Sequence, residues 1–239
     1  MARRSKTSAK SDPPRRPFGR RVAWILVRLV LAICVLGGLL VVLGTVINPP
    51  TTAYMYGESR RLGGVQQNWV ALDDVAPVMA RSAVAAEDAN FCRHWGFDMN
   101  AIRLAIAQGS SRGASTISQQ TVKNVYLWHG RSWFRKALEA VLTPVVEAIW
   151  SKRRILEVYL NVAEFDEGVF GVDAAARHYF GVAPDKLSAL QAARLAAILP
   201  SPKTRSASNP SDRVRRRTAQ VRDGAATIRA DGRAACFES

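Results

Sequence analysis

The apolar positions of this chain change pattern along its length, and the first pattern is a continuous run. From Val22 to Ile47 almost every residue is apolar, with Arg28 as the exception, and Leu29 to Ile47 is a run of 19 uncharged residues. A helix of that length rises about 28 Å, which is close to the thickness of a hydrocarbon core. Residues 22–47 are therefore predicted to form one transmembrane helix.

A cleaved signal peptide is the competing interpretation of this run. The apolar stretch is longer than a signal core, which has about 7 to 15 residues. No small-x-small cleavage site precedes Asn48-Pro49-Pro50. We therefore favour an anchor that stays in the protein.

After residue 68 the apolar residues recur at helical spacing almost throughout. Two sequences of the form S/T-x-x-E/Q, Thr116 to Gln119 and Ser188 to Gln191, are typical of capping boxes at helix starts. Strand signals are scarce, so the predicted fold class is all-α. The expected helices cover about 77–93, 100–108, 115–127, 132–150, 151–162, 170–180, 188–199 and 211–229.

Charge changes the picture at both ends. The chain has a formal net charge of +15, and residues 1–28 carry nine Lys/Arg against one Asp, while residues 203–239 carry nine against three Asp and one Glu. Basic ends favour anionic partners, either membrane phospholipid or nucleic acid. The predicted membrane helix selects phospholipid, and nucleic acid is not expected as a partner.

These features divide the chain into five parts. Residues 1–21 are predicted to be a basic cytoplasmic tail, since Lys and Arg before a membrane helix hold that end inside. The anchor at 22–47 and a linker at 48–67 follow. A globular domain is expected over 68–202, and a basic C-terminal tail, partly helical, over 203–239.

One carboxylate stands out within the predicted helix 77–93. Ala83, Glu87 and Phe91 would lie on one face at i, i+4 spacing. A carboxylate on an apolar stripe loses hydration, which raises its pKa toward the range useful to a general base. The alternative is an ordinary solvated or capped acid.

Four blocks in order decide between these interpretations. They are residues 83–96 (AVAAEDANFCRHWG), 112–124 (RGASTISQQTVKN), 135–139 (RKALE) and 152–161 (KRRILEVYLN). Together they resemble the peptidoglycan glycosyltransferase domain, glycosyltransferase family 51, over about residues 68–202. The resemblance implies a lysozyme-like, two-lobed fold. It also implies polymerisation of lipid II into glycan strands by an inverting single displacement that releases polyprenyl diphosphate.

The resemblance also implies roles for single residues. A glycosyl diphosphate is already activated, so the reaction needs a base for the acceptor hydroxyl and cations for the departing diphosphate. Glu87 matches the general base, and Glu139 matches a second essential carboxylate. Arg135 and Glu139 are i, i+4, which is also the spacing of an ordinary surface pair. The residues implied in substrate binding are Asp88, Phe91, His94, Thr116, Gln120, Lys123, Asn124, Arg135 and Lys136.

A loop rich in Gly and Ser, residues 108–114, precedes the second block and is predicted to be a lid over the phosphate site. Two positions depart from the family pattern: Ala114 stands where Gly is usual, and Ser118 stands where Thr is usual. Both changes keep a short side chain or a hydroxyl, so they bear on the mobility of the lid more than on activity.

Cofactors and covalent links are less determined. No metal-ligand spacing is visible, and a divalent cation, Mg²⁺ or Mn²⁺, is a candidate only at the diphosphate. The three cysteines, Cys34, Cys92 and Cys236, form no disulfide framework. A bridge between Cys92 and Cys236 is compatible with a location outside the cytoplasm, although nothing in the sequence favours it.

The expected location is the bacterial inner membrane, with a single pass, a cytoplasmic N-terminus and a periplasmic catalytic domain. The expected partners are lipid II, the growing glycan strand, membrane phospholipid and, as candidates, other proteins of cell-wall synthesis and division. Two other functions stay open, a membrane-anchored lysozyme-like hydrolase and a non-catalytic scaffold. A bifunctional synthase is excluded because the chain has no S-x-x-K or K-T-G sequence and no length for a transpeptidase domain.

Overall fold

The computed structural model describes residues 18–107, 109, 115–130 and 132–238. The chain forms two compact units that divide after Val42. The first unit consists of most of α1 (Phe18–Leu43), a helix long and apolar enough to cross a membrane. This helix fits the predicted single-pass anchor. It ends at Leu43, before the predicted end at residue 47, because residues 44–46 form a turn.

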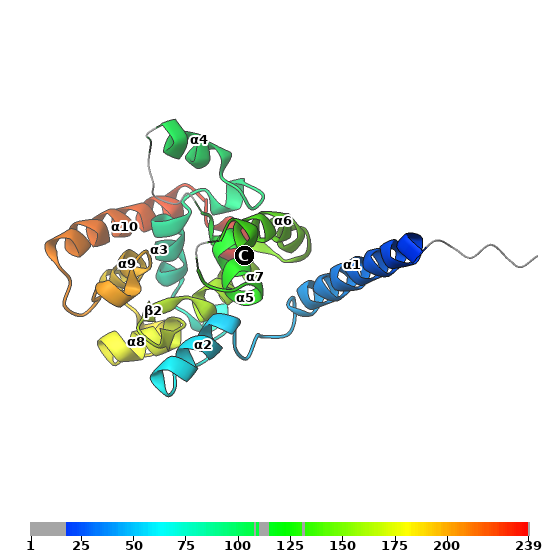
Figure 1. The fold of residues 1–239 in the computed structure, drawn as a ribbon. Helices are drawn as coiled ribbons and strands as arrows, with labels where there is room; N and C mark the ends of the chain where they lie inside the picture. Colours follow the sequence, from blue (N-terminus) through cyan, green and yellow to red (C-terminus); the bar gives the residue numbers. More distant parts are fainter. Residues whose placement is uncertain (1–17, 108, 110–114, 131, 239) are drawn as a thin grey trace, which may run out of the picture. The chain divides into compact units, whose positions relative to one another are not determined.

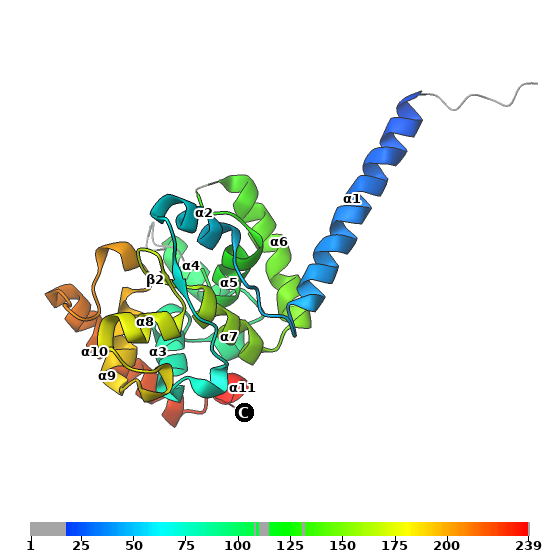
Figure 2. The same ribbon diagram turned by 90° about the horizontal axis from the view of Figure 1, so that it is seen from below.

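The second unit, residues 43–239, is mostly helical (Figures 1 and 2), which confirms the all-α prediction. The capping boxes predicted at Thr116 and Ser188 are both formed. Its helices are α2 (Ala53–Leu62), α3 (Pro77–Glu87), α4 (Met99–Ala107), α5 (Ile117–Tyr126), α6 (Trp133–Ile149), α7 (Lys152–Val162), α8 (Val172–Phe180), α9 (Ala189–Ile198), α10 (Asp212–Ala230) and α11 (Ala235–Glu238).

Helix α2 lies where the sequence predicted a linker. Thr52 caps it by accepting a hydrogen bond from the Met55 N–H, and Gly63 ends it with φ of 79°. A glycine tolerates this left-handed conformation, which is common just after a helix. The cap signals were present in the sequence, but α2 buries only Met55 fully and so has little apolar periodicity.

The helices of the second unit pack in two groups (Figure 1). Helices α3, α9 and α10 contact one another, and α5 packs against both α6 and α7. Helix α7 has the most buried side chains because its predicted apolar stripe points into the core: Ile155, Leu156, Tyr159 and Leu160 are all at most 1% exposed. The candidate residues of α3 and of α5 therefore come from different helix groups.

A small sheet joins the N-terminal part of the domain to its middle. Strands β1 (Gln66–Gln67), β3 (Val169–Phe170) and β2 (Glu164–Asp166) lie in that order, with β1 parallel and β2 antiparallel to β3. Asn161 supports this edge, since its amide donates to the Val70 carbonyl at 2.8 Å and its oxygen accepts from the Val70 N–H at 2.9 Å. Because the strands contain so few residues, strand signals are scarce in the sequence.

Helix α3 ends at Glu87, six residues before the predicted end at residue 93. The backbone turns at Asp88, whose φ is −161° and ψ 68°. Its side chain accepts a hydrogen bond from the Ile117 N–H at 3.0 Å, at the start of α5. This bond draws the chain away from the helix, and Phe91 to Arg93 form a separate 3₁₀ turn.

The C-terminal segment 203–239, predicted to be a basic tail, is packed into the domain. Helix α10 contacts both α3 and α9, and α11 contacts α7. The buried side chains of α10 recur at helical spacing and form one face: Val214, Thr218, Val221, Ala225 and Ile228. Residues after 202 are thus part of the compact unit and are not an appendage.

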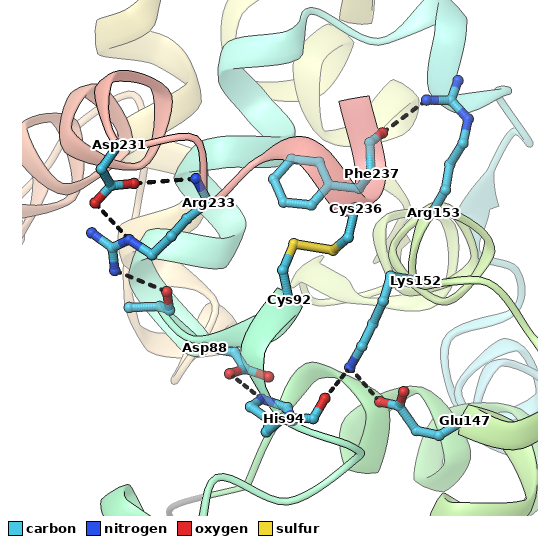
Figure 3. Close-up of a disulfide and its surroundings, with 11 residues drawn as sticks. Asp88, Cys92, His94, Glu147, Lys152, Arg153, Asp231, Arg233, Cys236 and Phe237 are labelled. Atoms are coloured by element: carbon cyan, nitrogen blue, oxygen red, sulfur yellow. Dashed lines mark hydrogen bonds and ion pairs between the residues drawn. A yellow bond between two sulfur atoms is a disulfide. The ribbon is translucent and has the colours of Figure 1, made fainter. Parts of the chain in front are cut away.

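A disulfide fastens the end of this segment, a link that the sequence left open. Cys92, in the turn after α3, is bonded to Cys236 in α11, across 144 residues of sequence (Figure 3). The adjacent Phe237 is buried, and its carbonyl accepts from Arg153 Nη1 at 2.8 Å. Arg233 donates to the Ala89 carbonyl at 3.1 Å. The residues that follow Glu87 are therefore held by the last turn of the chain.

Removing this disulfide is expected to destabilise the domain. A cross-link over a long loop restricts the unfolded chain and typically contributes about 2 to 4 kcal/mol. We expect Cys92→Ser with Cys236→Ser, or reduction of the intact protein, to lower the free energy of unfolding by about this amount in denaturant titrations. Cys34→Ser is the control, because Cys34 is unpaired. Equal stability of oxidised and reduced protein would contradict the assignment.

Candidate active site

Glu87 lies at the C-terminal end of α3, and its side chain is only 12% exposed. The Gln120 amide, from α5, donates to Glu87 Oε2 at 3.0 Å. Burial raises the pKa of Glu87, while the Gln120 hydrogen bond and the positive charges of Arg217, Arg205 and Lys123 act against this rise. The structure thus gives Glu87 the partly desolvated environment that the sequence predicted.

Asp88, the next residue, organises the surrounding backbone. Its second carboxylate oxygen, Oδ1, lies 2.7 Å from His94 Nε2 (Figure 3). Thr116 adds a further link between the same segments, because its hydroxyl donates to the Gly96 carbonyl at 2.6 Å. These contacts join the turn after α3 to the start of α5, so Glu87 and the α5 side chains are held in one frame.

Five of the residues implied in substrate binding are buried: Asp88, Phe91, His94, Thr116 and Asn124. Phe91 is fully buried, with the Lys152 ammonium 4.5 Å from its ring centroid. Of these five, Asn124 lines the cavity described below, whereas Asp88, Phe91, His94 and Thr116 do not. We therefore regard these four as positioning residues. The half-buried Gln120, Lys123, Arg135 and Lys136 remain candidates for direct contact.

Lys123, on α5, is a half-buried cation of the site. Burial lowers the pKa of its ammonium, the carboxylates of Glu139 and Glu87 raise it, and nearby Arg135 and Lys136 lower it further. Within the described residues, the Lys123 ammonium forms no hydrogen bond or ion pair, and only the backbone of this residue is bonded, through its carbonyl to the Leu127 N–H. A partly desolvated ammonium without a partner is stabilised by any anion that enters the site.

Glu139, on α6, is the centre of a charged cluster. It is 2% exposed, accepts from Arg135 Nη1 at 2.7 Å, and is paired with the Lys136 ammonium. Lys136 also donates to the Ser115 hydroxyl at 3.2 Å, next to the start of α5. The pairing predicted from the i, i+4 spacing is therefore present and is buried, unlike an ordinary surface pair. Arg135 and Lys136 together outweigh the single charge of Glu139, and the nearby Lys123 adds a third positive charge.

A cavity of about 220 Å³ lies next to Lys123 and next to Gln120, the hydrogen-bond partner of Glu87. Gln120, Lys123 and Asn124 line it from α5, and Tyr159 lines it from α7. The Asn124 Oδ1 atom is buried and has no hydrogen-bond partner among the described residues. A larger cavity, of about 600 Å³, lies near Arg81, Arg153 and Phe237 and contains none of the candidate residues. We place the site at the smaller cavity because the candidate residues Gln120, Lys123 and Asn124 line it.

The predicted lid, residues 108–114, lies outside the described residues except for Gly109. Ser118, one of the two departures from the family pattern, is fully buried and donates to Glu147. Glu147 also pairs with Lys152 at 2.7 Å, and Lys152 donates to the His94 carbonyl at 2.8 Å (Figure 3). Lys152, in the fourth block, therefore links the turn after α3 to the buried Glu147.

Sequence reasoning missed Arg217 and Arg205, which lie beyond the family blocks. Arg217, on α10, has its Nη2 atom 3.9 Å from Glu87 Oε1. The signal that could have found it is the apolar spacing of α10, which predicts packing against the domain and places Arg217 beside the buried Thr218.

A model of the transglycosylase family matches residues 57–226. The chain belongs to the transglycosylase family. This confirms the resemblance found in the four blocks, and the match extends past residue 202 into α10. As in other members of this family, the expected fold is lysozyme-like and helical, in agreement with the structure.

Individual transglycosylases are similar over most of the chain. A biosynthetic peptidoglycan transglycosylase of Jannaschia sp. (strain CCS1) is 57% identical over 237 residues, covering 99% of each chain. One of Caulobacter vibrioides is 44% identical, covering 92% of this chain and 99% of the relative. One of Pseudomonas fluorescens is 48% identical, covering 81% and 85%.

Proposed function

We propose that this protein is a membrane-anchored peptidoglycan glycosyltransferase that polymerises lipid II into glycan strands and releases polyprenyl diphosphate. One observation carries the proposal. A desolvated carboxylate, Glu87, lies close to a positive cluster formed by Lys123, Arg135 and Lys136 around Glu139. A general base beside an anion-binding group is what transfer from a glycosyl diphosphate requires.

In the proposed reaction, Glu87 takes the proton of the acceptor 4-hydroxyl. The acceptor oxygen attacks C1 of the donor sugar from the face opposite the diphosphate. A new C1–O bond forms as the bond to the diphosphate oxygen breaks, and the configuration at C1 is inverted. The electron pair leaves on the diphosphate, where Lys123, Arg135 and Lys136 stabilise it; Arg135 offers a planar fork, and the lysines act as point charges.

A divalent cation at the diphosphate stays a prediction, and the proposed reaction assigns it no step. Among the residues that the structure describes, no group of three or more His, Cys, Asp or Glu side chains could hold a metal ion. Glu139 already pairs with two cations. Any Mg²⁺ or Mn²⁺ would therefore be bound mainly by the substrate's own phosphate oxygens.

A lysozyme-like hydrolase is the rival function and uses carboxylates without a phosphate site. The partly buried Lys123 ammonium, which has no partner among the residues that the structure describes, argues against it, since a hydrolase has no anion for this residue to stabilise. Purified full-length protein should convert labelled lipid II into glycan strands and leave preformed glycan intact. Cleavage of preformed glycan, without consumption of lipid II, would show the hydrolase to be correct; inactivity on both substrates would favour a scaffold.

The outer surface of the domain suits a lipid-linked substrate. Helix α6 exposes Phe134, Val141, Val145 and Ile149, which are seven and four residues apart and so share a face. Trp133 at its start is 92% exposed. Helix α4 and the segment before it expose further large apolar side chains, namely Trp95, Met99, Leu104 and Ile106. We propose that these surfaces contact the acyl region of the membrane.

We further propose that α1 crosses the bacterial inner membrane with its N-terminus in the cytoplasm. The basic residues before the anchor favour this orientation. The disulfide between Cys92 and Cys236 supports it, because such bonds persist in oxidising compartments such as the periplasm. The candidate partners in that location remain membrane phospholipid, the growing glycan strand, and proteins of cell-wall synthesis and division.

The domain is expected to bind membranes without its anchor. We would delete residues 1–42, because the carbonyl groups of Gly44 and Ile47 accept hydrogen bonds from Arg154 and belong to the domain. The remaining protein should bind anionic phospholipid vesicles in flotation. Trp133→Ser with Phe134→Ser should weaken binding by at least about tenfold, given the apolar area lost.

Leu190→Ser is the matched control for that pair. Leu190 is an exposed apolar residue on α9, away from α4 and α6 in sequence and structure. Its replacement should leave vesicle binding unchanged. A truncated protein that remains wholly in the aqueous phase would contradict membrane docking by these helices.

A further inference from the structure

The C-terminal helix α10 lies directly against the helix that ends in Glu87. Its buried face packs on α3, and a Cβ atom at Gly224 would approach the Ala85 Cβ to 3.2 Å, so the two helices are close at that level. Two turns earlier on α10, Arg217 Nη2 donates to the Ala86 carbonyl at 2.9 Å. The same atom is 3.9 Å from Glu87 Oε1.

This placement opposes two effects that disfavour an ionised Glu87. The last carbonyl groups of a helix have no partner within it, and the negative end of the helix dipole repels a carboxylate there. Burial of Glu87 acts in the same direction. A guanidinium bonded to the Ala86 carbonyl satisfies one of those groups and places a positive charge beside the carboxylate.

The other groups around Glu87 are less able to stabilise its ionised form. Gln120 is neutral, and Tyr159 is fully buried with its pKa raised well above the ordinary value by burial, so its phenol stays neutral. Asp88 adds a negative charge and is engaged with His94 and the Ile117 N–H. Lys123 faces the Glu139 cluster as well, and Arg205 donates to the Ala197 carbonyl at 3.1 Å.

We propose that Arg217 is a positioning residue for the reaction: its guanidinium holds the last turn of α3 and favours the ionised, proton-accepting form of Glu87. This inference rests on the proposed role of Glu87 as general base. The Arg217 side chain is 37% exposed, so solvent screens part of its effect. Arg217 thereby keeps Glu87 ionised, and so able to accept a proton, at a lower pH than burial alone would permit.

The pH dependence of activity tests this role. With full-length protein in detergent and lipid II as substrate, kcat/KM should fall at low pH as Glu87 becomes protonated. Loss of the positive charge in Arg217→Gln raises the pKa of Glu87, so this acid limb should move to higher pH by about one unit, the lower end of the effect of an opposite charge at this distance. Activity should recover above the limb.

Two further variants separate charge from structure. Arg217→Lys keeps the charge and should restore the acid limb to within a few tenths of its original pH. Arg216→Gln makes the same charge change on the neighbouring exposed residue and should leave the profile unchanged. Uniform loss of activity at every pH in Arg217→Gln, or an equal shift in Arg216→Gln, would overturn the proposal.

A titration that needs no turnover distinguishes this failure from failure of the proposed function. The side-chain carboxyl of Glu87 can be followed by ¹³C NMR in glutamate-labelled protein, with its signal assigned by its absence in Glu87→Gln. Its midpoint should be higher in Arg217→Gln than in the original protein. An unchanged midpoint would overturn the role of Arg217 even if lipid II is polymerised. Absent polymerisation with a shifted midpoint would instead refute the proposed function alone.

Discussion

Replacing Glu87 with Gln is expected to abolish polymerisation of lipid II while leaving the domain folded. The amide keeps the shape of the side chain and its position beside Gln120, but it cannot accept the proton of the acceptor hydroxyl. Loss of a general base typically lowers the rate by about 10² to 10⁴. Initial rates of lipid II consumption by the two purified proteins give this ratio directly.

The stability of the same variant makes the result decisive. The pKa of Glu87 is raised in the fold, so its stabilising contribution is present below the unfolded-state pKa and lost as pH rises through the folded-state pKa. At about pH 7.5 a neutral Gln should therefore leave Tm unchanged or slightly higher. Glu167→Gln, on an exposed side chain, is the matched control. Near-normal turnover in Glu87→Gln would remove this residue from catalysis.

Replacing Lys123 with Ala is expected to lower activity by about 10² or more. The ammonium lies beside the Glu139 cluster with no partner of its own among the described residues, so it is available to the charge that develops on the diphosphate. Loss of one group that stabilises such charge typically lowers kcat by about 10² to 10³. Steady-state kinetics with lipid II measure the effect.

Lys123 is a cleaner test of phosphate recognition than Arg135. Arg135 pairs with the buried Glu139, so its removal leaves a buried carboxylate partly unpaired and destabilises the fold. Burial already disfavours the Lys123 charge, so Lys123→Met should keep or raise Tm while losing activity as Lys123→Ala does. Lys186→Ala, on an exposed residue, is the control. A loss of activity that only parallels a loss of folded protein would mean that the diphosphate is held elsewhere.

Local sequence signals predicted most of the helices. The capping boxes at Thr116 and Ser188 depend on side chains three residues apart, and both form as expected. The apolar stripe of α7 was equally clear, since its side chains fill the core. Of the site, the desolvated Glu87 and the pairing of Arg135 with Glu139 followed from helical spacing and the family resemblance.

Contacts between distant segments could not be predicted in the same way. Helix α3 ends at Glu87 because Asp88 is bonded to the start of α5, a partner 29 residues away. The site role of Arg217 and the pairing of Cys92 with Cys236 depend on where α10 and α11 pack, and no local pattern contains that information. The four family blocks did not indicate a role for α10 and α11 either, because the blocks end at residue 161, before these helices.

The order of these contacts along the chain has a consequence for how the enzyme is made. Ala86, Ala89 and Cys92 take one partner each from Arg217, Arg233 and Cys236, which lie 131 to 144 residues later in the chain. The ribosome therefore makes α3 well before it makes these partners. Under the proposed topology, α3 crosses the membrane before α10 and α11, so Glu87 gains the support of Arg217 only after the later helices have followed, and the disulfide forms after that.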